Sequence, residues 1–417
     1  METKTFDGIR IPGLPGRYMF PPVPGVYISG TEPMEADAKV WVNPYGNKIG
    51  NGLYSYASMY GVVSAVLNDA YINTAKKYST IANALAGSNE TTDGKVLAYT
   101  NGGMLNIVLT EDMASAEIIT VTKDCTIHLN GHELSFAVGK HFLLKSGKMT
   151  INGTVKGSKI AKTNISGGAE FLIRTEGVDG TELRLIGGIY SITGTATTGI
   201  VPICMKDYTY AKLTLCGCDV VVNGSATSVI SGLQVADDTI IENCNFDVDG
   251  SGCETTSINS RNAKHEYTLT VRDSTFVTKG NTKSVLGITL AARNGVVNNC
   301  TFLTVAISDG LEVKCITAAN TCNHLTINNC HAKANGDGTA DVYAVYRSSE
   351  STEVAINNGY YYGANKAFSL SGTAHINGET VDGTAYTDKE ISLGTETAAD
   401  TAILSVKDED GNWVGVC

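Results

Sequence analysis

The second half of the chain repeats a short motif in which apolar and polar residues alternate. Apolar residues occupy positions one, three, six and eight of each copy, and a small polar pair lies between positions three and six. Because successive side chains of a strand point to opposite faces, each copy predicts two short β-strands joined by a tight corner. From residue 151 to residue 376, the third positions of successive copies are about 20 to 34 residues apart, a period typical of a solenoid. The clearest copies span residues 213–220, 239–246, 269–276, 295–302, 325–332 and 354–361.

The corner of each copy carries a residue type that tolerates a positive φ angle. These position-five residues are Asn243, Asp273, Asn299, Asn329 and Asn358, with Gly187, Gly217 and Gly378 in other copies. Stacked coils place such side chains about 4.8 Å apart, so we expect a hydrogen-bonded ladder at the corner. Positions six and eight are expected to point inward as columns of like residues. They hold Cys218, Cys244, Ser274, Cys300 and Cys330, and then Tyr190, Val220, Phe246, Phe276, Phe302 and Tyr361.

A third apolar segment lies between successive copies, at residues 229–233, 285–289, 313–317 and 342–346. Three strands per coil predict an all-β protein, a parallel β-helix solenoid over residues 104–383. If the first valine of each segment points inward, the outward positions form an apolar face that we interpret as a subunit interface. A bulge that changes the phase, or a loop that covers this face, are the alternatives. The proposed interface residues are Ile230, Leu286, Ile288, Leu290, Ile316 and Val345.

The N-terminal part of the chain has a different character. Seven of the eight prolines lie in the first 44 residues, which predicts an extended arm over residues 1–50. The arm is too apolar for an ordinary linker, so we expect it to dock on a partner. Residues 51–103 are expected to form a short helical neck, and residues 384–417 a small C-terminal cap. The helical seam is Tyr56, Tyr60, Val63, Leu67 and Ala70, and Gly87 is the expected helix end.

Composition narrows the classes of function. The net charge of -11 disfavours nucleic acid or an anionic membrane as a partner. The sequence has no run of about 18 apolar residues, so we expect no segment to insert into a membrane. The 11 cysteines form no CxxC pair, so we interpret them as buried packing residues of a chain made in a cytoplasm, and we expect no metal and no cofactor.

Two stretches resemble known families. The opening coil NIVLTEDMASAEIITVTKDCTIHLNGHELSF and the LTINNC coils resemble right-handed β-helix proteins of the pectin-lyase-like type, over roughly residues 104–383. The stretch GTEPMEADAKVWVNPYGN at residues 30–47 resembles the N-terminal attachment segments of bacteriophage fibre and spike proteins. This second resemblance implies a homotrimer on the virion surface, assembled in the host cytoplasm and docked to a capsid or tail protein. The implied docking residues are Tyr18, Phe20, Tyr27 and Trp41.

The resemblance implies a virion structural protein that presents the β-helix for binding to the host surface or to a glycan. The candidate glycan-binding residues are Tyr208, Tyr210, Tyr360 and Tyr362, because aromatic rings stack on sugars. A polysaccharide depolymerase on the same scaffold is one alternative, and a bacterial surface adhesin is the other. A hydrolase needs a pair of carboxylates, for which Asp237, Asp247, Asp249 and Glu266 are candidates. We favour their interpretation as solvated turn residues, and therefore a protein without catalytic activity.

Overall fold

The computed structural model describes residues 75–394, apart from 102, 177, 206–210, 261–265 and 338–339. Outside that range it describes only the backbone of eight short strands. They are β1 (Thr3–Thr5), β2 (Ile9–Arg10), β3 (Tyr18–Met19), β4 (Ser29–Thr31), β5 (Tyr54–Ala57), β6 (Val63–Val66), β42 (Ser405–Lys407) and β43 (Trp413–Gly415).

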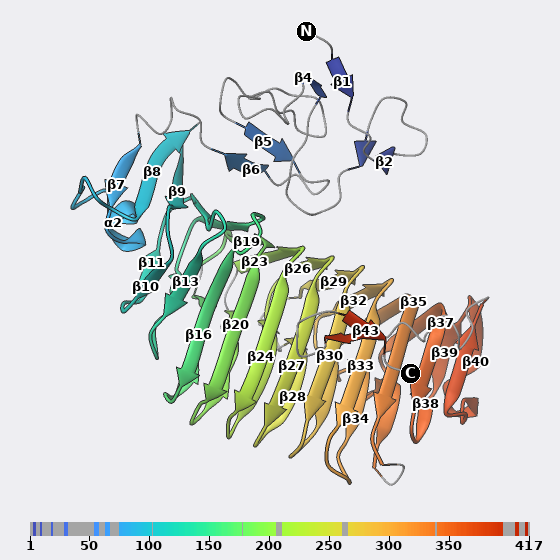
Figure 1. The fold of residues 1–417 in the computed structure, drawn as a ribbon. Helices are drawn as coiled ribbons and strands as arrows, with labels where there is room; N and C mark the ends of the chain where they lie inside the picture. Colours follow the sequence, from blue (N-terminus) through green and yellow to red (C-terminus); the bar gives the residue numbers. More distant parts are fainter. Residues whose placement is uncertain are drawn as a thin grey trace.

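The chain winds through a stack of coils, each with three strands, and the coils follow one another in chain order along the stack (Figure 1). The first strands of the coils are β9 (Met104–Leu109), β12 (Cys125–His128), β15 (Lys148–Gly153), β19 (Thr181–Gly187), β23 (Ala211–Cys216), β26 (Thr239–Glu242), β29 (Thr268–Arg272) and β32 (Asn294–Asn298). In the last coils the first and second strands run on without a break, as β35 (His324–Asn335) and β37 (Glu353–Gly363).

The second strands lie beyond the corner of each coil. They are β10 (Met113–Ser115), β13 (Glu133–Phe136), β16 (Lys159–Ile165), β20 (Ile189–Thr195), β24 (Asp219–Ser225), β27 (Asn245–Ser251), β30 (Thr275–Gly280) and β33 (Thr301–Ala306). The third strands form a separate 12-stranded sheet. They are β11 (Ile119–Val121), β14 (Phe142–Leu144), β17 (Ala169–Glu170), β18 (Ile173–Thr175), β21 (Gly199–Ile200), β22 (Ile203–Met205), β25 (Val229–Val235), β28 (Glu254–Ser260), β31 (Val285–Leu290), β34 (Val313–Ala318), β36 (Val342–Arg347) and β38 (Lys366–Ser369).

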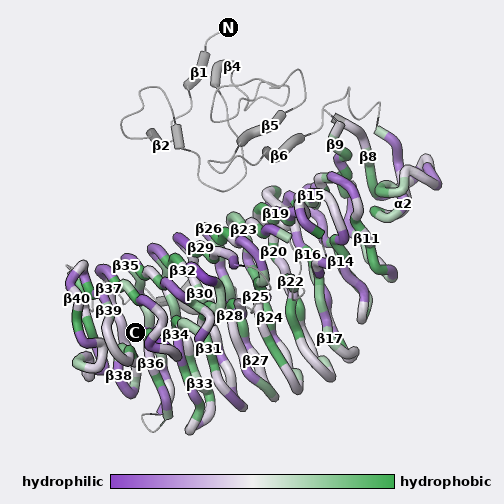
Figure 2. The backbone as a smooth tube through the Cα atoms, turned by 180° about the vertical axis from the view of Figure 1, so that it is seen from behind, coloured by the Kyte–Doolittle hydropathy of each residue, from purple (hydrophilic) through white to green (hydrophobic). Residues whose placement is uncertain are grey.

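Each strand pairs in parallel with the equivalent strand of the next coil, so the predicted parallel β-helix is confirmed. The inward columns are the expected ones. Phe246, Phe276 and Phe302 are at most 1% exposed, and their rings stack with centroids 5.0 and 4.8 Å apart. Polar and apolar residues alternate along the strands because one side of each strand faces this core and the other faces outward (Figure 2).

The corners also follow the sequence pattern. The asparagine and aspartate residues expected there have φ angles of 50–53°, and Gly187 and Gly217 have φ angles of 63° and 64°. The expected side-chain ladder forms only in part at the corner position, where Asn299 donates a hydrogen bond to Asp273 at 3.1 Å. A second ladder lies one residue earlier, because Asn328 donates to Asn298 at 2.7 Å and Asn357 donates to Asn328 at 2.9 Å.

We expect Asn299→Ala to lower the free energy of unfolding by about 1–2 kcal/mol, since alanine is strained at positive φ and the bond to Asp273 is lost. Asn299→Gly removes the same side chain without the backbone strain, so its loss should be smaller. Urea denaturation of both variants measures the difference. Asn294→Ala, on the same coil but without a positive φ, is the control. Equal losses for the alanine and glycine variants at 299 would show that the backbone conformation contributes nothing.

Antiparallel strands cover both ends of the stack. At the start, β8 (Val96–Asn101) pairs with β9, and β7 (Lys76–Tyr78) pairs with β8. The short helix α2 (Ile81–Ala86) places Ile81 and Leu85 against the end of the core. At the other end, β39 (Thr373–Ile376) continues the parallel stack, β40 (Glu379–Asp382) turns back on it, and β41 (Glu390–Leu393) pairs antiparallel with β37. The 3₁₀ turn η1 (Gly383–Ala385) links these last strands. Such caps satisfy strand edges that would otherwise template aggregation.

The predicted helical seam is wrong at two of its five positions. Tyr56 lies in β5 and Val63 in β6, which pair antiparallel. Tyr60, Leu67 and Ala70 lie outside the described residues. The helix described in this region is α2, where Thr80 accepts from the Asn83 N–H and Gly87 ends the helix at φ 66°, as expected. The 4-3-4-3 spacing over two heptads is too short a signal to exclude strands, in which aromatic and β-branched residues are also favoured.

The predicted apolar outer face of the third strands is also wrong. Ile230, Ile288, Leu290, Ile316 and Val345 are all 0% exposed and point into the core, and Leu286, which keeps an outward register, is 8% exposed. The reason is a change of phase at a small residue in the middle of each third strand, where pairing is interrupted. Val285 and Ile288 both point inward because Gly287 lies between them at this break. The equivalent small residues are Gly232, Ser257, Cys315 and Ala344.

Candidate functional site

The outward face of the second strands gathers four of the residues predicted for function. Asp247 and Asp249 lie on β27, and Tyr360 and Tyr362 lie on the matching part of β37. The parallel register places Asp247, Val277, Leu303, Lys333 and Tyr362 in one column. Asp247 and Tyr362 are four coils apart in this column, or about 19 Å at the usual strand spacing. We call this surface the second-strand face.

The tyrosine end of the second-strand face forms an aromatic platform. Tyr361 is fully buried, so its neighbours Tyr360 and Tyr362 point outward, as expected. Lys333 on the preceding coil places its Nζ 5.8 Å from the centre of the Tyr362 ring. On the other side, β41 places Glu390 opposite Tyr362 and Ser392 opposite Tyr360. Burial raises the pKa of Tyr360, and the nearby Glu390 carboxylate adds to this. We define the platform as Tyr360, Tyr362, Lys333 and Glu390.

This platform combines two properties suited to a polar, ring-shaped ligand. Tyr362 is half-buried, so part of its ring remains accessible for stacking. Lys333 and Glu390 flank it with one donor and one acceptor group, which can orient hydroxyl groups at the edge of a stacked sugar. Tyr360 is only 8% exposed and supports the edge of the platform more than it presents a surface.

The acidic candidates divide into one neighbouring pair and two separate residues. Asp247 and Asp249 are two residues apart on one strand and share a face, so their Cα atoms lie about 6.6 Å apart. Asp247 is flanked by Val221 and Val277 on the adjacent coils, and Asp249 is paired in register with Lys279. Asp237 is 5% exposed and accepts from the Asp238 N–H at 2.6 Å. Glu266 forms an ion pair with Arg293. The four carboxylates therefore do not converge on one site.

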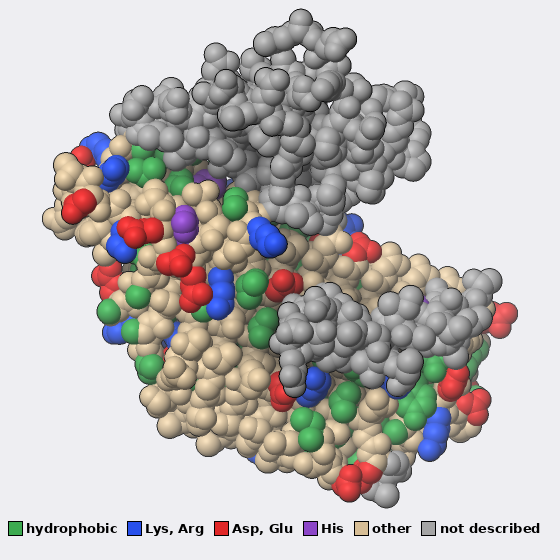
Figure 3. Space-filling view, in the orientation of Figure 1, with side chains coloured by type: hydrophobic (Ala, Val, Ile, Leu, Met, Phe, Trp, Pro, Cys, Tyr) green, Lys and Arg blue, Asp and Glu red, His purple; other side chains and the backbone are tan. Residues whose placement is uncertain are grey.

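A small apolar cluster separates the acidic pair from the aromatic platform. Val277 and Leu303 are 2% and 5% exposed, and Val305 packs against them. Acidic, basic and hydrophobic side chains are interspersed over the side of the molecule seen in Figure 3, without a broad area of one sign of charge. Such a mixed surface suits a neutral or weakly charged ligand more than a strongly charged polymer.

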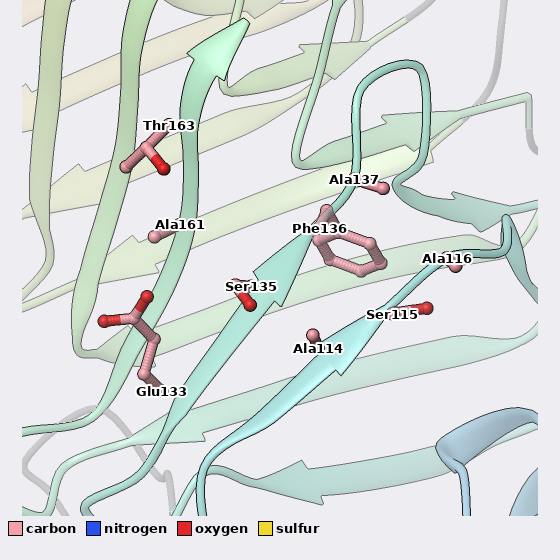
Figure 4. A pocket seen from close by; sticks show the side chains of 9 residues that line it. All are labelled: Ala114, Ser115, Ala116, Glu133, Ser135, Phe136, Ala137, Ala161 and Thr163. Atoms are coloured by element: carbon pink, nitrogen blue, oxygen red, sulfur yellow. The ribbon is translucent and has the colours of Figure 1, made fainter.

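A hollow of about 280 Å³ lies near the start of the solenoid, over β10, β13 and β16 (Figure 4). It exists because the outward column there carries small residues, Ala114, Ser135 and Ala161, where later coils carry Val221 or Leu303. The ionisable residue in its lining is Glu133, which forms an ion pair with Lys159 at 3.2 Å. A single paired carboxylate does not supply the acid and base that glycoside hydrolysis requires. The run of small residues in register was the sequence signal for this hollow, and we did not predict it.

The remaining predicted site residues lie outside the described part of the chain. These are the glycan-binding candidates Tyr208 and Tyr210, and the arm residues Phe20, Tyr27 and Trp41, while Tyr18 lies in β3, of which only the backbone is described.

Buried charges are the residues that sequence reasoning missed. Lys162 on β16 and Glu170 on β17 point into the core, their side chains are 0% exposed, and they form an ion pair at 2.8 Å. Lys162 also donates to the Phe171 carbonyl at 2.7 Å, and Glu170 accepts from the Gly139 N–H at 3.0 Å. Burial lowers the pKa of Lys162, and Glu170 opposes that shift. The pair fixes the loop between β16 and β18 to the core, so its role is structural.

The ten described cysteines are buried free thiols, which confirms their interpretation as packing residues. Burial raises the pKa of Cys125 and Cys315 to about 12, which keeps these thiols protonated and unreactive at neutral pH. Within the described ranges, no three His, Cys, Asp or Glu side chains are grouped closely enough to hold a metal ion. In the same part of the chain, no helix is long and apolar enough to cross a membrane.

Comparison of the chain with models of known protein families, with curated proteins and with solved structures found no match in any of the three.

Proposed function

We propose that the protein is a β-helical fibre or spike of a virion, and that the aromatic platform binds a host-surface glycan without cleaving it. The observation that carries the glycan part is the outward Tyr362, flanked by Lys333 and Glu390 at the end of a stiff solenoid. The virion part rests on the resemblance of residues 30–47 to phage attachment segments. A homotrimer belongs to the same proposal, but its interface is not the apolar third-strand face expected from the sequence.

A stacked β-helix suits this role physically. Its coils are joined by parallel pairing along the whole described stack, so surface residues several coils apart keep fixed spacings. A rigid surface loses little entropy when an extended polymer binds across it. A site built on flexible loops would lose conformational entropy at each contact.

We expect Tyr362→Ala to weaken binding to a recognised bacterial surface polysaccharide about tenfold, because one sugar-stacking ring is worth about 1.4 kcal/mol. Binding of the purified full-length protein to a panel of such polysaccharides, by biolayer interferometry, measures the change. Tyr346→Ala is the matched control, since Tyr346 is also half-buried and outward but lies on the third-strand face, stacked on Tyr343. An equal loss from both variants, or no binding to any member of the panel, contradicts the proposed platform.

The depolymerase alternative is favoured by one observation, the shared outward face of Asp247 and Asp249. They project from the same side of one strand, and a glycosidase requires such a pair of neighbouring carboxylates. If it is correct, the bound polysaccharide is shortened and new reducing ends accumulate, and Asp249→Asn abolishes their release. If the binding proposal is correct, no reducing ends form, and Asp249→Asn leaves the polymer length unchanged. Light scattering during chromatography of the same full-length sample tests the trimer.

A further inference from the structure

One outward column of side chains on the first strands is buried although it faces away from the core. It is the fourth position of the first strands, just before each corner, and it runs over six consecutive coils from β9 to β26. The side chains in this column are only 3–6% exposed. We call them the covered strip: Val108, His128, Asn152, Ile186, Cys216 and Glu242.

The register shows that the covered strip lies outside the core. Leu185 and Leu215, one residue before Ile186 and Cys216, belong to the continuous core cluster, whereas Ile186 and Cys216 do not. Cys218, two residues after Cys216 and beyond the corner, points inward and is 0% exposed. An outward column on a single-layered solenoid should be accessible. Asn152 is covered in part by its own coil, because Thr154 donates its N–H and its hydroxyl group to the Asn152 Oδ1, and the burial of the other members indicates a further covering segment.

Burial of this column stops abruptly along the stack. After Glu242, the next residue in the column is Arg272, whose side chain is 44% exposed, and Asn298 and Asn328 beyond it are half-buried. The covered strip therefore has a definite end, five coil spacings or about 24 Å from its start. A cover of limited length explains this end better than a general property of the column.

The covered strip begins where the N-terminal segment enters the solenoid. Val108 packs with Leu97 and Tyr99 of β8 in a small cluster separate from the core, and Ala75 packs against this cluster. Ala75 is the residue at which residues 1–74 join the described chain. Those 74 residues are long enough to cross six coils several times, since an extended chain spans about 3.3 Å per residue.

The chemistry of the covered strip suits an apolar cover. Its polar members already have partners: His128 bonds to Asn106 at 3.1 Å and to Asn152 at 3.4 Å, and Glu242 pairs with Arg272. Val108, Ile186 and Cys216 contribute apolar surface. The N-terminal segment supplies matching side chains, because it is unusually apolar for a proline-rich stretch. Examples are Ile9, Ile11, Leu14, Tyr18, Met19, Phe20, Val23, Val26, Tyr27 and Ile28.

We infer that residues 1–74 fold back onto the covered strip of their own chain and dock there. This interaction is intramolecular and does not depend on the glycan platform. It holds residues 1–74 at a fixed place on the solenoid, so any attachment to another protein through these residues would start from that place.

Photo-cross-linking in the full-length chain tests this inference. A benzophenone amino acid is placed at Thr214, which lies two residues before Cys216 on the same strand and the same face. The matched control position is Thr326, which occupies the same column four coils further on, beyond the covered strip. We expect Thr214, and not Thr326, to cross-link to peptides from residues 1–74. A mixture of ¹⁵N-labelled and unlabelled protein identifies whether both peptides come from one copy.

Cross-links between labelled and unlabelled copies would overturn the inference in favour of a second copy as the cover. Absence of any cross-link from Thr214 to residues 1–74 would overturn it as well. Glycan binding is not a readout of either experiment, so this test and the test of the proposed function fail independently.

Thiol labelling gives a second measurement on the unmodified full chain. In native buffer we expect N-ethylmaleimide to leave Cys216 and Cys218 unmodified. In increasing urea, undocking of residues 1–74 should expose Cys216 at a lower urea concentration than Cys218, whose exposure requires the coil itself to open. Tandem mass spectrometry separates the two sites. Native labelling of Cys216 at the rate of an exposed thiol, or simultaneous labelling of both, would contradict the docking.

Discussion

Lys162→Met is expected to lower the free energy of unfolding by about 3–5 kcal/mol, because it leaves the Glu170 carboxylate buried without its cation. Both side chains are completely buried, and the carboxylate keeps only the Gly139 N–H as a partner. The Phe171 carbonyl also loses a donor. Urea denaturation gives the total loss, and hydrogen exchange of β16 and β18 shows whether the early coils open first.

Two further variants show whether this loss comes from the buried charge left without a partner. Lys148→Met removes a cation from the exposed pair with Glu182, at 3.5 Å, and should cost less than about 1 kcal/mol. Lys162→Met/Glu170→Leu replaces both buried charges with apolar side chains and should recover much of the loss. Apolar side chains of this size are already present at the equivalent positions of the next coil, because Lys162 stacks on Ile192 and Glu170 stacks on Ile200. A loss at Lys162 no larger than at Lys148 would show that the buried pair contributes little.

Phe276→Ala is the second large effect, with an expected loss of about 3–5 kcal/mol in the free energy of unfolding. Phe276 is the middle ring of the stack and contacts a ring on either side, so its removal leaves a cavity bounded by two rigid coils. Strands held by parallel pairing on both sides cannot move together to fill that space. Urea denaturation of the variant measures the loss.

The conservative substitution and a surface control calibrate this value. Phe276→Leu keeps most of the apolar volume and should cost less than Phe276→Ala, by about 2 kcal/mol. Ile307→Ala changes a side chain that is 60% exposed, so its effect should stay within about 0.5 kcal/mol. A loss from Phe276→Ala as small as that of Ile307→Ala would mean that the ring stack is not part of a tightly packed core.

The candidate site was predicted unevenly. The outward orientation of Tyr362 followed from the inward position of Tyr361, because alternation within one strand is a local rule. Its neighbours Lys333 and Glu390 were not predicted, because they come from a different coil and from a strand that turns back antiparallel. The acidic candidates failed as a group for the same reason. Asp237 and Glu266 are close to the β27 pair in the sequence, but Asp237 is buried and accepts from the Asp238 N–H, and Glu266 pairs with Arg293.

By itself, the sequence determined the coil and its corners. Positions one, three, six and eight set the inward columns, and asparagine or glycine at position five set the bend, because both are local requirements repeated in every coil. Only the tertiary structure decided the phase of the third strands, where a small residue such as Gly287 allows two inward residues that are three positions apart in the sequence. It also decided the Lys162–Glu170 pair and the burial of the covered strip. These depend on which coil lies beside which and on what packs over the outside, and no periodicity within one strand records such contacts.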